Sequence, residues 1–232
     1  MTLELATLPL AALNIRRYHF SPGGGADPAR PLDVVHFAGE ACLAGGAALF
    51  ALLRERGETH WPCLVRPANS ADGAFLTALA LAFPEPGENT AAEKTLVSQR
   101  LREAALPPAA AEACRRAGGL PADGALAETL DMLTGLDETA LGYLHAVRAG
   151  LKQLQGVRRL PEAAPAFLAG SARALHLNAN QLRRALELLG DIRLAGGEIG
   201  PFLDRRPAVD ANLPLLAGEF LTELEAARFP EF

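Results

Sequence analysis

The stretch DVVHFAGEACLAGGAALFALLRERGETHWPCLV, residues 33–65, decides the fold that we expect for this chain. Within it an apolar run, a Gly-Gly turn, an amphipathic run and a second apolar run follow one another, which is typical of strand, helix and strand. The pattern predicts strands at Asp33–Phe37, Ala41–Leu43 and Trp61–Val65, and a helix from Ala47 to Arg56. This segment therefore indicates a small α/β unit.

The pair Gly45–Gly46 stands where the second of these strands turns into the helix. Glycine lets the backbone approach a ligand closely, and the free N–H groups of a helix N-terminus favour an anion such as phosphate. An ordinary strand-to-helix turn is the alternative, since the residues that follow, Ala47–Leu49, offer only backbone groups. A ligand at this corner would need further contacts from Arg16, Arg17 or His36.

Other candidate groups for chemistry lie around this corner. The segment Asn14–His19 holds adjacent arginines that could grip phosphate oxygens bidentately, although a solvated turn fits it equally well. Cys42 and Cys63 fall inside expected strands, where a small buried hydrophobe is the commoner role than a nucleophile. The histidines show no metal-binding spacing, and no hydrolase or phosphate-loop motif occurs. The sequence thus predicts no catalytic and no metal-ligating residue.

Composition narrows the class of protein. Half of the 232 residues are hydrophobic, yet no long uncharged apolar run occurs, so we expect a globular chain with no membrane contact. The odd number of widely spaced cysteines fits the cytoplasm better than a disulfide framework. The net charge of −5 argues against strong nonspecific binding to nucleic acid. The ending ARFPEF, without a polar tail, also fits a part of a longer protein.

Helical patterns dominate after the α/β unit. Ser70 or Asp72 could cap a helix through Phe83, and Thr90 could cap the next one. Glycines and prolines then divide the chain into shorter helices, of which the clearest begins at Asn178. The expected fold class is α+β, with an α/β domain over residues 1–88 and an all-α helical bundle over residues 89–232.

One part of the helical region, residues 107–134, has the spacing of a helix-turn-helix. Its second helix carries Asp123, Glu128 and Asp131 and no basic residue. A helix that reads a DNA groove lies among phosphates, where carboxylates lower the affinity. A helical pair that serves only packing is therefore the favoured interpretation, with DNA binding as the alternative.

The order of these elements resembles the ParB-like family, whose N-terminal domain is related to that of sulfiredoxin. The resemblance covers the whole chain and depends on a collinear series of weak matches. These are LNIRR with Asn14 and Arg16, AGGAALFALLRERGETHWPCLV with its glycines, GENTAAEKTLVSQRL with Glu88 and Asn89, and the downstream helices GLKQLQGVRRLP and LHLNANQLRRALELLGDI.

The resemblance implies a ParB/sulfiredoxin-like domain followed by a helical, helix-turn-helix-like region, and a nucleotide site for CTP with magnesium. Carried over residue by residue, that site comprises Asn14, Arg16, Arg17, Gly45, Gly46, Glu88 and Asn89. The family's arginine pair after the strand is absent, since both Gly39–Cys42 and Gly45–Ala48 lack it. Losing such charge-assisted contacts weakens nucleotide binding, so we expect no catalysis.

The leading hypothesis is a divergent, non-catalytic ParB-like protein of the cytoplasm in DNA-linked regulation or partition. It would form a homodimer and bind DNA or a protein partner. A ParB-like nuclease or CTP hydrolase that uses the Gly45–Gly46 corner is one alternative. A helical protein-interaction adaptor that has lost both ligands is the other.

Overall fold

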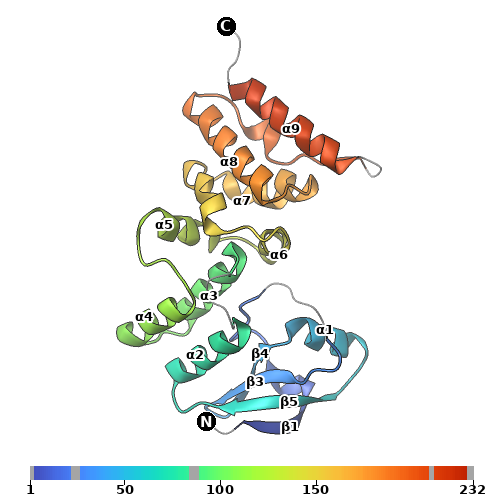
Figure 1. Cartoon of the computed structure of the whole chain (residues 1–232), viewed down its shortest axis with the longest axis vertical. Coiled ribbons are helices and arrows are strands. Elements are labelled where there is room, and N and C mark those ends of the chain that lie inside the picture. Colours follow the sequence, from blue (N-terminus) through green and yellow to red (C-terminus); the bar gives the residue numbers. More distant parts are fainter. Residues whose placement is uncertain (1–2, 22–26, 84–88, 209–211, 229–232) are drawn as a thin grey trace. The chain divides into compact units, whose positions relative to one another are not determined.

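The computed structural model describes residues 3–21, 27–83, 89–208 and 212–228. In chain order the elements are β1 (Glu4–Pro9), η1 (Leu10–Ala12), β2 (Leu13–Asn14), β3 (Leu32–Phe37), β4 (Glu40–Gly45), α1 (Ala47–Glu55), β5 (His60–Pro67), α2 (Ala71–Ala82), α3 (Ala91–Glu103), α4 (Pro108–Ala117), α5 (Gly124–Leu133), α6 (Glu138–Ala146), η3 (Leu151–Arg159), α7 (Ala164–Phe167), η4 (Leu168–Ala172), α8 (Ala179–Leu194), η5 (Gly200–Phe202) and α9 (Leu213–Arg228) (Figure 1). The sheet precedes the helices, which confirms the α+β fold class.

The chain divides into two compact units. Unit 1 comprises Met1–Asn89 and Glu93–Ala122, and unit 2 comprises Thr90–Ala92 and Asp123–Phe232. Helices α3 and α4 therefore belong largely to the unit that holds the sheet, whereas the sequence placed them in a helical domain that begins at residue 89. The helices of the expected helix-turn-helix, α4 and α5, fall in different units. A helix-turn-helix over residues 107–134 stays a prediction.

The sheet of unit 1 has the strand order β1-β5-β3-β4-β2. Strands β3 and β4 form an antiparallel hairpin, and β3 runs parallel to β5, which α1 connects to β4. β1 pairs with β5 antiparallel, and the short β2 pairs with β4 parallel. The three strands predicted between residues 33 and 65 are thus confirmed, and the predicted helix is α1.

One face of this sheet forms the core with α1. In β3, Leu32 and Val34 are fully buried and lie in a cluster with Leu43 of β4. The same cluster contains Leu49, Phe50 and Leu53, which recur along α1 at the spacing of one helical face. Side chains alternate between the two faces of a strand, so the residues between these point to the other face.

Helix α2 contacts β3 and β4, as Figure 1 shows for unit 1. Its N-cap is Ser70, whose hydroxyl accepts a hydrogen bond from the N–H of Gly73 at 3.2 Å, and this confirms one of the two predicted caps. Its Phe75 packs against Tyr18 and Phe20 with ring centroids 6.0 and 5.2 Å apart. These aromatic contacts hold the segment after β2 against α2.

Cys42, Cys63 and Cys114 are free and fully buried. Burial raises the pKa of each thiol above its usual range, to about 11 for Cys114. A thiolate is the reactive form, so these side chains behave as small hydrophobes. The interpretation of Cys42 and Cys63 as core residues is confirmed.

Unit 2 is built around α8, which contacts both η3 and α9. The side chain of Asn178 accepts hydrogen bonds from the N–H groups of Asn180 and Gln181, and Gln181 accepts one from the N–H of Asn178. This capping box starts α8 where the sequence predicted. Along α8 the apolar face, which includes Leu182, Leu186 and Leu189, is fully buried. In the described part of the chain, no helix has the length and apolarity needed to cross a membrane.

The turn between β4 and α1 requires glycine at position 46. Gly46 is the N-cap of α1 with φ of 83°, in the left-handed region that side chains disfavour. A Cβ there would also lie 2.9 Å from Cδ2 of the buried Leu32. The backbone conformation and the packing therefore select the same residue.

We expect Gly46→Ala to destabilise unit 1 by about 2–4 kcal/mol, because left-handed strain and overpacking add. Gly57→Ala is the matched control, since Gly57 has φ of 76° with open space around its Cα, and it should cost only about 1–2 kcal/mol. Urea unfolding followed by circular dichroism measures both. Equal losses in the two variants would contradict the role given to Leu32.

Candidate functional site

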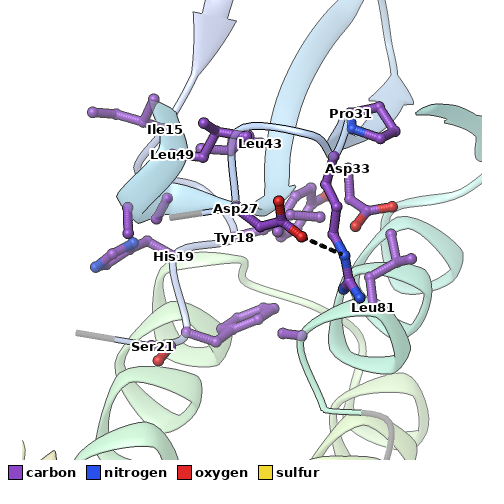
Figure 2. A pocket seen from close by; sticks show the side chains of 18 residues that line it. Ile15, Tyr18, His19, Ser21, Asp27, Pro31, Asp33, Leu43, Leu49 and Leu81 are labelled. Carbon is purple, nitrogen blue, oxygen red and sulfur yellow. Dashed lines mark ion pairs between the residues drawn. The ribbon is translucent and has the colours of Figure 1, made fainter. Parts of the chain in front are cut away.

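A pocket of about 330 Å³ lies at the Gly45–Gly46 corner of unit 1. Its lining comes from the end of β4, the first turn of α1, the start of β3, the end of α2 and the segments on either side of residues 22–26. Figure 2 shows His19 and Ser21 on one side of this pocket, with Asp33 and Leu81 on the other. The volume is at the lower end of the range for small-molecule sites.

The first turn of α1 supplies the pocket with backbone donors. The N–H of Phe50 makes the first intrahelical bond, to the carbonyl of Gly46 at 2.8 Å. Ala47, Ala48 and Leu49 precede that bond, all three line the pocket, and no side chain caps the helix. Their N–H groups and the helix dipole together create a positive potential that favours an anion.

Charged and polar side chains surround these donors. Arg30 pairs with Asp27, with 3.3 Å between Nε and Oδ2, and both side chains are exposed (Figure 2). An exposed pair of this kind contributes little to stability, so the guanidinium can turn to a ligand at small cost. His19 and Ser21 complete the polar part of the lining. The pocket thus combines donors for an anion with carboxylates that accept hydrogen bonds.

Asp33 is the carboxylate closest to the glycine pair. A Cβ on Gly45 would lie 3.1 Å from Oδ2 of Asp33, so the glycine leaves the space that this side chain occupies. Burial raises the pKa of the Asp33 carboxyl above its usual value of 3.8, while the positive charges of Arg66 and Arg30 act in the opposite direction. The carboxylate is therefore half-buried beside the glycine pair, and the two arginines do not fully offset the cost of burying its charge.

The structure places part of the predicted site elsewhere. The Oδ1 of Asn14 accepts hydrogen bonds from the N–H groups of Arg16 and Arg17, which makes a local turn. Arg17 pairs with Glu40 at 2.7 Å, and its guanidinium lies 5.9 and 5.7 Å from the ring centroids of Tyr18 and Phe37. Arg16 is exposed, and like Asn14 and Arg17 it is absent from the pocket lining.

The remaining predicted residues divide between the pocket, the core and the undescribed part of the chain. Gly45 and Gly46 line the pocket, and their contact with a nucleotide stays a prediction. Asn89 is buried outside its lining, and Glu88 lies outside the described residues. His36, which the sequence suggested as a further ligand contact, borders a separate open groove of about 660 Å³ together with Asn14. Nucleotide contacts by the residues outside the lining stay predictions.

Sequence reasoning missed the charged residues that line the pocket. Arg30 and Asp27 lie in a Gly/Pro-rich segment that carries no binding motif, and in the sequence Asp33 only marks the start of a predicted strand. Among the described residues, His, Cys, Asp and Glu form no cluster that could hold a metal ion. Comparison of the chain with protein-family models and with curated proteins finds no match.

Asp33→Asn should stabilise unit 1 at neutral pH. The raised pKa means that folding disfavours the ionised carboxyl, a penalty that is absent below pH 3.8 and sets in as pH rises through the folded-state pKa. The melting temperature of the variant should therefore exceed that of the wild type at pH 7, and the difference should vanish at pH 3. Asp27→Asn, at an exposed carboxylate, is the control. If Asp33→Asn is less stable than the wild type at pH 7, the ionised Asp33 carboxylate does not destabilise the fold and the prediction is wrong.

Proposed function

We propose that the chain is a divergent ParB-like protein of the cytoplasm that acts in DNA-linked regulation or partition and binds a nucleotide-type ligand without turning it over. The position of the pocket carries this proposal. It lies at the Gly45–Gly46 corner, which is the corner that the resemblance assigns to a nucleotide, and there Arg30 joins the free N–H groups of α1. Main-chain donors at a helix N-terminus combined with a guanidinium are a common phosphate-binding arrangement.

The contacts available predict weak binding. The helix N-terminus contributes about 0.3–1 kcal/mol per charge, and a hydrogen bond from Arg30 about 1.5–3 kcal/mol. A millimolar dissociation constant corresponds to about 4 kcal/mol. Without the family's arginine pair, the pocket should bind a nucleotide with a dissociation constant of roughly millimolar order. CTP with magnesium would then be a regulatory ligand that binds reversibly and is not turned over.

A thermal-shift panel of CTP, ATP and inorganic phosphate, each with and without Mg²⁺, tests the proposal. At least one nucleotide should raise the melting temperature, and Arg30→Ala should abolish that shift because Arg30 lines the pocket. Arg16→Ala is the matched control, as Arg16 lies outside the lining. Ala48→Glu should remove the shift as well, since it places a carboxylate at the donors. If no ligand moves the melting temperature, the proposal fails.

A hydrolase or nuclease is the second candidate. Asp27, Asp33 and His19 all line the pocket, and carboxylates with an imidazole are the usual groups for acid–base chemistry. The thermal-shift samples also serve to measure phosphate release from CTP with Mg²⁺. Release that stops in Asp33→Asn would support this candidate over the first.

We propose that the link to DNA runs through a protein partner and that the chain works as a homodimer. Several arginines of unit 2 already have carboxylate partners: Arg158 with Glu128, Arg159 and Arg228 with Asp191, Arg183 with Glu187, Arg184 with Glu225, and Arg205 with Glu223. On α5, Glu128 and Asp131 are exposed. DNA phosphates would have to displace these carboxylates, which favours a protein partner.

The purified chain should therefore fail to retard duplex DNA at physiological salt, with or without CTP. Direct binding would appear as retardation that weakens steeply as salt rises, because it releases counterions from the DNA. Such retardation would show that the chain binds DNA directly and would contradict the proposed protein partner. A helical adaptor that binds neither DNA nor nucleotide would show no thermal shift either.

A further inference from the structure

The outer edge of β1 is open to another strand. β1 stands at one end of the sheet order, and within the described residues no strand pairs with its outer side. An open edge presents a row of unpaired N–H and C=O groups, which is a template for pairing with a second chain.

The pairing of β1 with β5 fixes which residues point outward. The N–H of Leu10 donates to the carbonyl of Thr59 at 2.9 Å, one step beyond the paired Pro9 and His60. Because hydrogen-bonded pairs alternate in an antiparallel ladder, Leu8, Ala6 and Glu4 also direct their backbone groups to β5. Pro62 lies opposite Thr7, where a residue without an N–H is tolerated, so the alternation is consistent.

The residues in between, Leu3, Leu5 and Thr7, direct their backbone groups away from the sheet. Their side chains lie on the face opposite to Leu8, which packs against the core. Leu5 is 68% exposed and Leu3 is 52% exposed. Natural edge strands are usually protected by an inward charge, a lysine or a proline along the edge. In β1 the face of Leu3, Leu5 and Thr7 carries no charge, Glu4 lies on the face of Leu8, and Pro9 stands only at the end.

We propose that β1 is the dimer interface of this chain, where it pairs antiparallel with β1 of a second copy so that Leu5 lies opposite Leu5. This inference rests on the proposed homodimer and assigns its surface. Two-fold symmetry requires the antiparallel direction. In this register Leu3 and Thr7 of the two copies form hydrogen-bonded pairs, and Glu4 faces Ala6.

The neighbouring registers are less favourable. A shift in one direction places Glu4 opposite Glu4, and like charges directly opposite each other are destabilising. A shift in the other direction places Leu3 opposite Pro9, which has no N–H to donate at a position that needs one. The register centred on Leu5 avoids both and joins the exposed leucines of the two copies on one face.

The interface is small. A stable complex usually buries about 1,200–2,000 Å² in total, which a single pair of six-residue strands does not reach by itself. We therefore expect a reversible dimer whose population depends on protein concentration. A partner protein that occupies the same edge would compete with it.

Charge reversal at the two-fold axis tests the proposal. Size-exclusion chromatography with light scattering should give a mass for the full chain that rises from monomer to dimer with concentration. Leu5→Lys and Leu5→Glu should each weaken dimerisation by about tenfold or more, because each places like charges opposite each other. A mixture of the two variants should dimerise again, because Lys then faces Glu. Circular dichroism should show that both variants keep the fold, as Leu5 is exposed.

Leu215→Lys is the matched control, because Leu215 is a 58% exposed leucine on α9, and it should leave the dimer unchanged. A wild type that stays monomeric at every concentration would overturn both the homodimer and its interface. A dimer that survives in Leu5→Lys would overturn the interface alone. Monomeric variants that do not dimerise on mixing would overturn the register. None of these outcomes bears on the nucleotide pocket, whose test is the thermal shift.

Discussion

The contact between Leu32 and Gly46 is the constraint on which unit 1 depends. Leu32 lies at the start of β3 with no exposure, and the backbone of Gly46 passes directly over it. This close approach lets α1 leave β4 at an angle that brings Leu49, Phe50 and Leu53 onto the sheet. It also places the first turn of α1 in the lining of the pocket. Core and pocket therefore follow from one steric fit, and the glycine itself needs no ligand to explain it.

The sheet and the helices around it could largely be predicted because their signals are local. A short apolar run marks β3, and the caps Ser70 and Asn178 mark α2 and α8. β1 and β2 were missed, since alanines and the 3₁₀ turn at Leu10–Ala12 break their alternation. Which helices pack together is a tertiary property: α4 contacts α2, whereas α5 contacts η3. The spacing of α4 and α5 along the chain carries no information on these partners.

In the candidate site, too, local sequence patterns do not reveal which residues come together. The sequence places Arg17 beside other cationic and aromatic residues, which suggests a phosphate contact. In the structure the partners of Arg17 are Glu40, Tyr18 and Phe37. Two of them belong to the β3–β4 hairpin, which is distant from Arg17 in the sequence. Asp33 reaches the glycine corner through the register of the β3–β4 hairpin, in which it lies opposite Gly45, and Arg30 precedes the same strand. Charge type was visible in the sequence, but the placement of each charge depends on the strand register.

The burial of the cysteines has a practical consequence. All three lie in unit 1, with Cys42 on β4, Cys63 on β5 and Cys114 on α4. A thiol reagent can reach them only when this unit opens, because the folded state both covers the sulfur atoms and disfavours the thiolate. The rate of labelling by such a reagent thus reports the opening of unit 1 and gives no information on unit 2. The chain carries its own probe for separating the stabilities of its two halves.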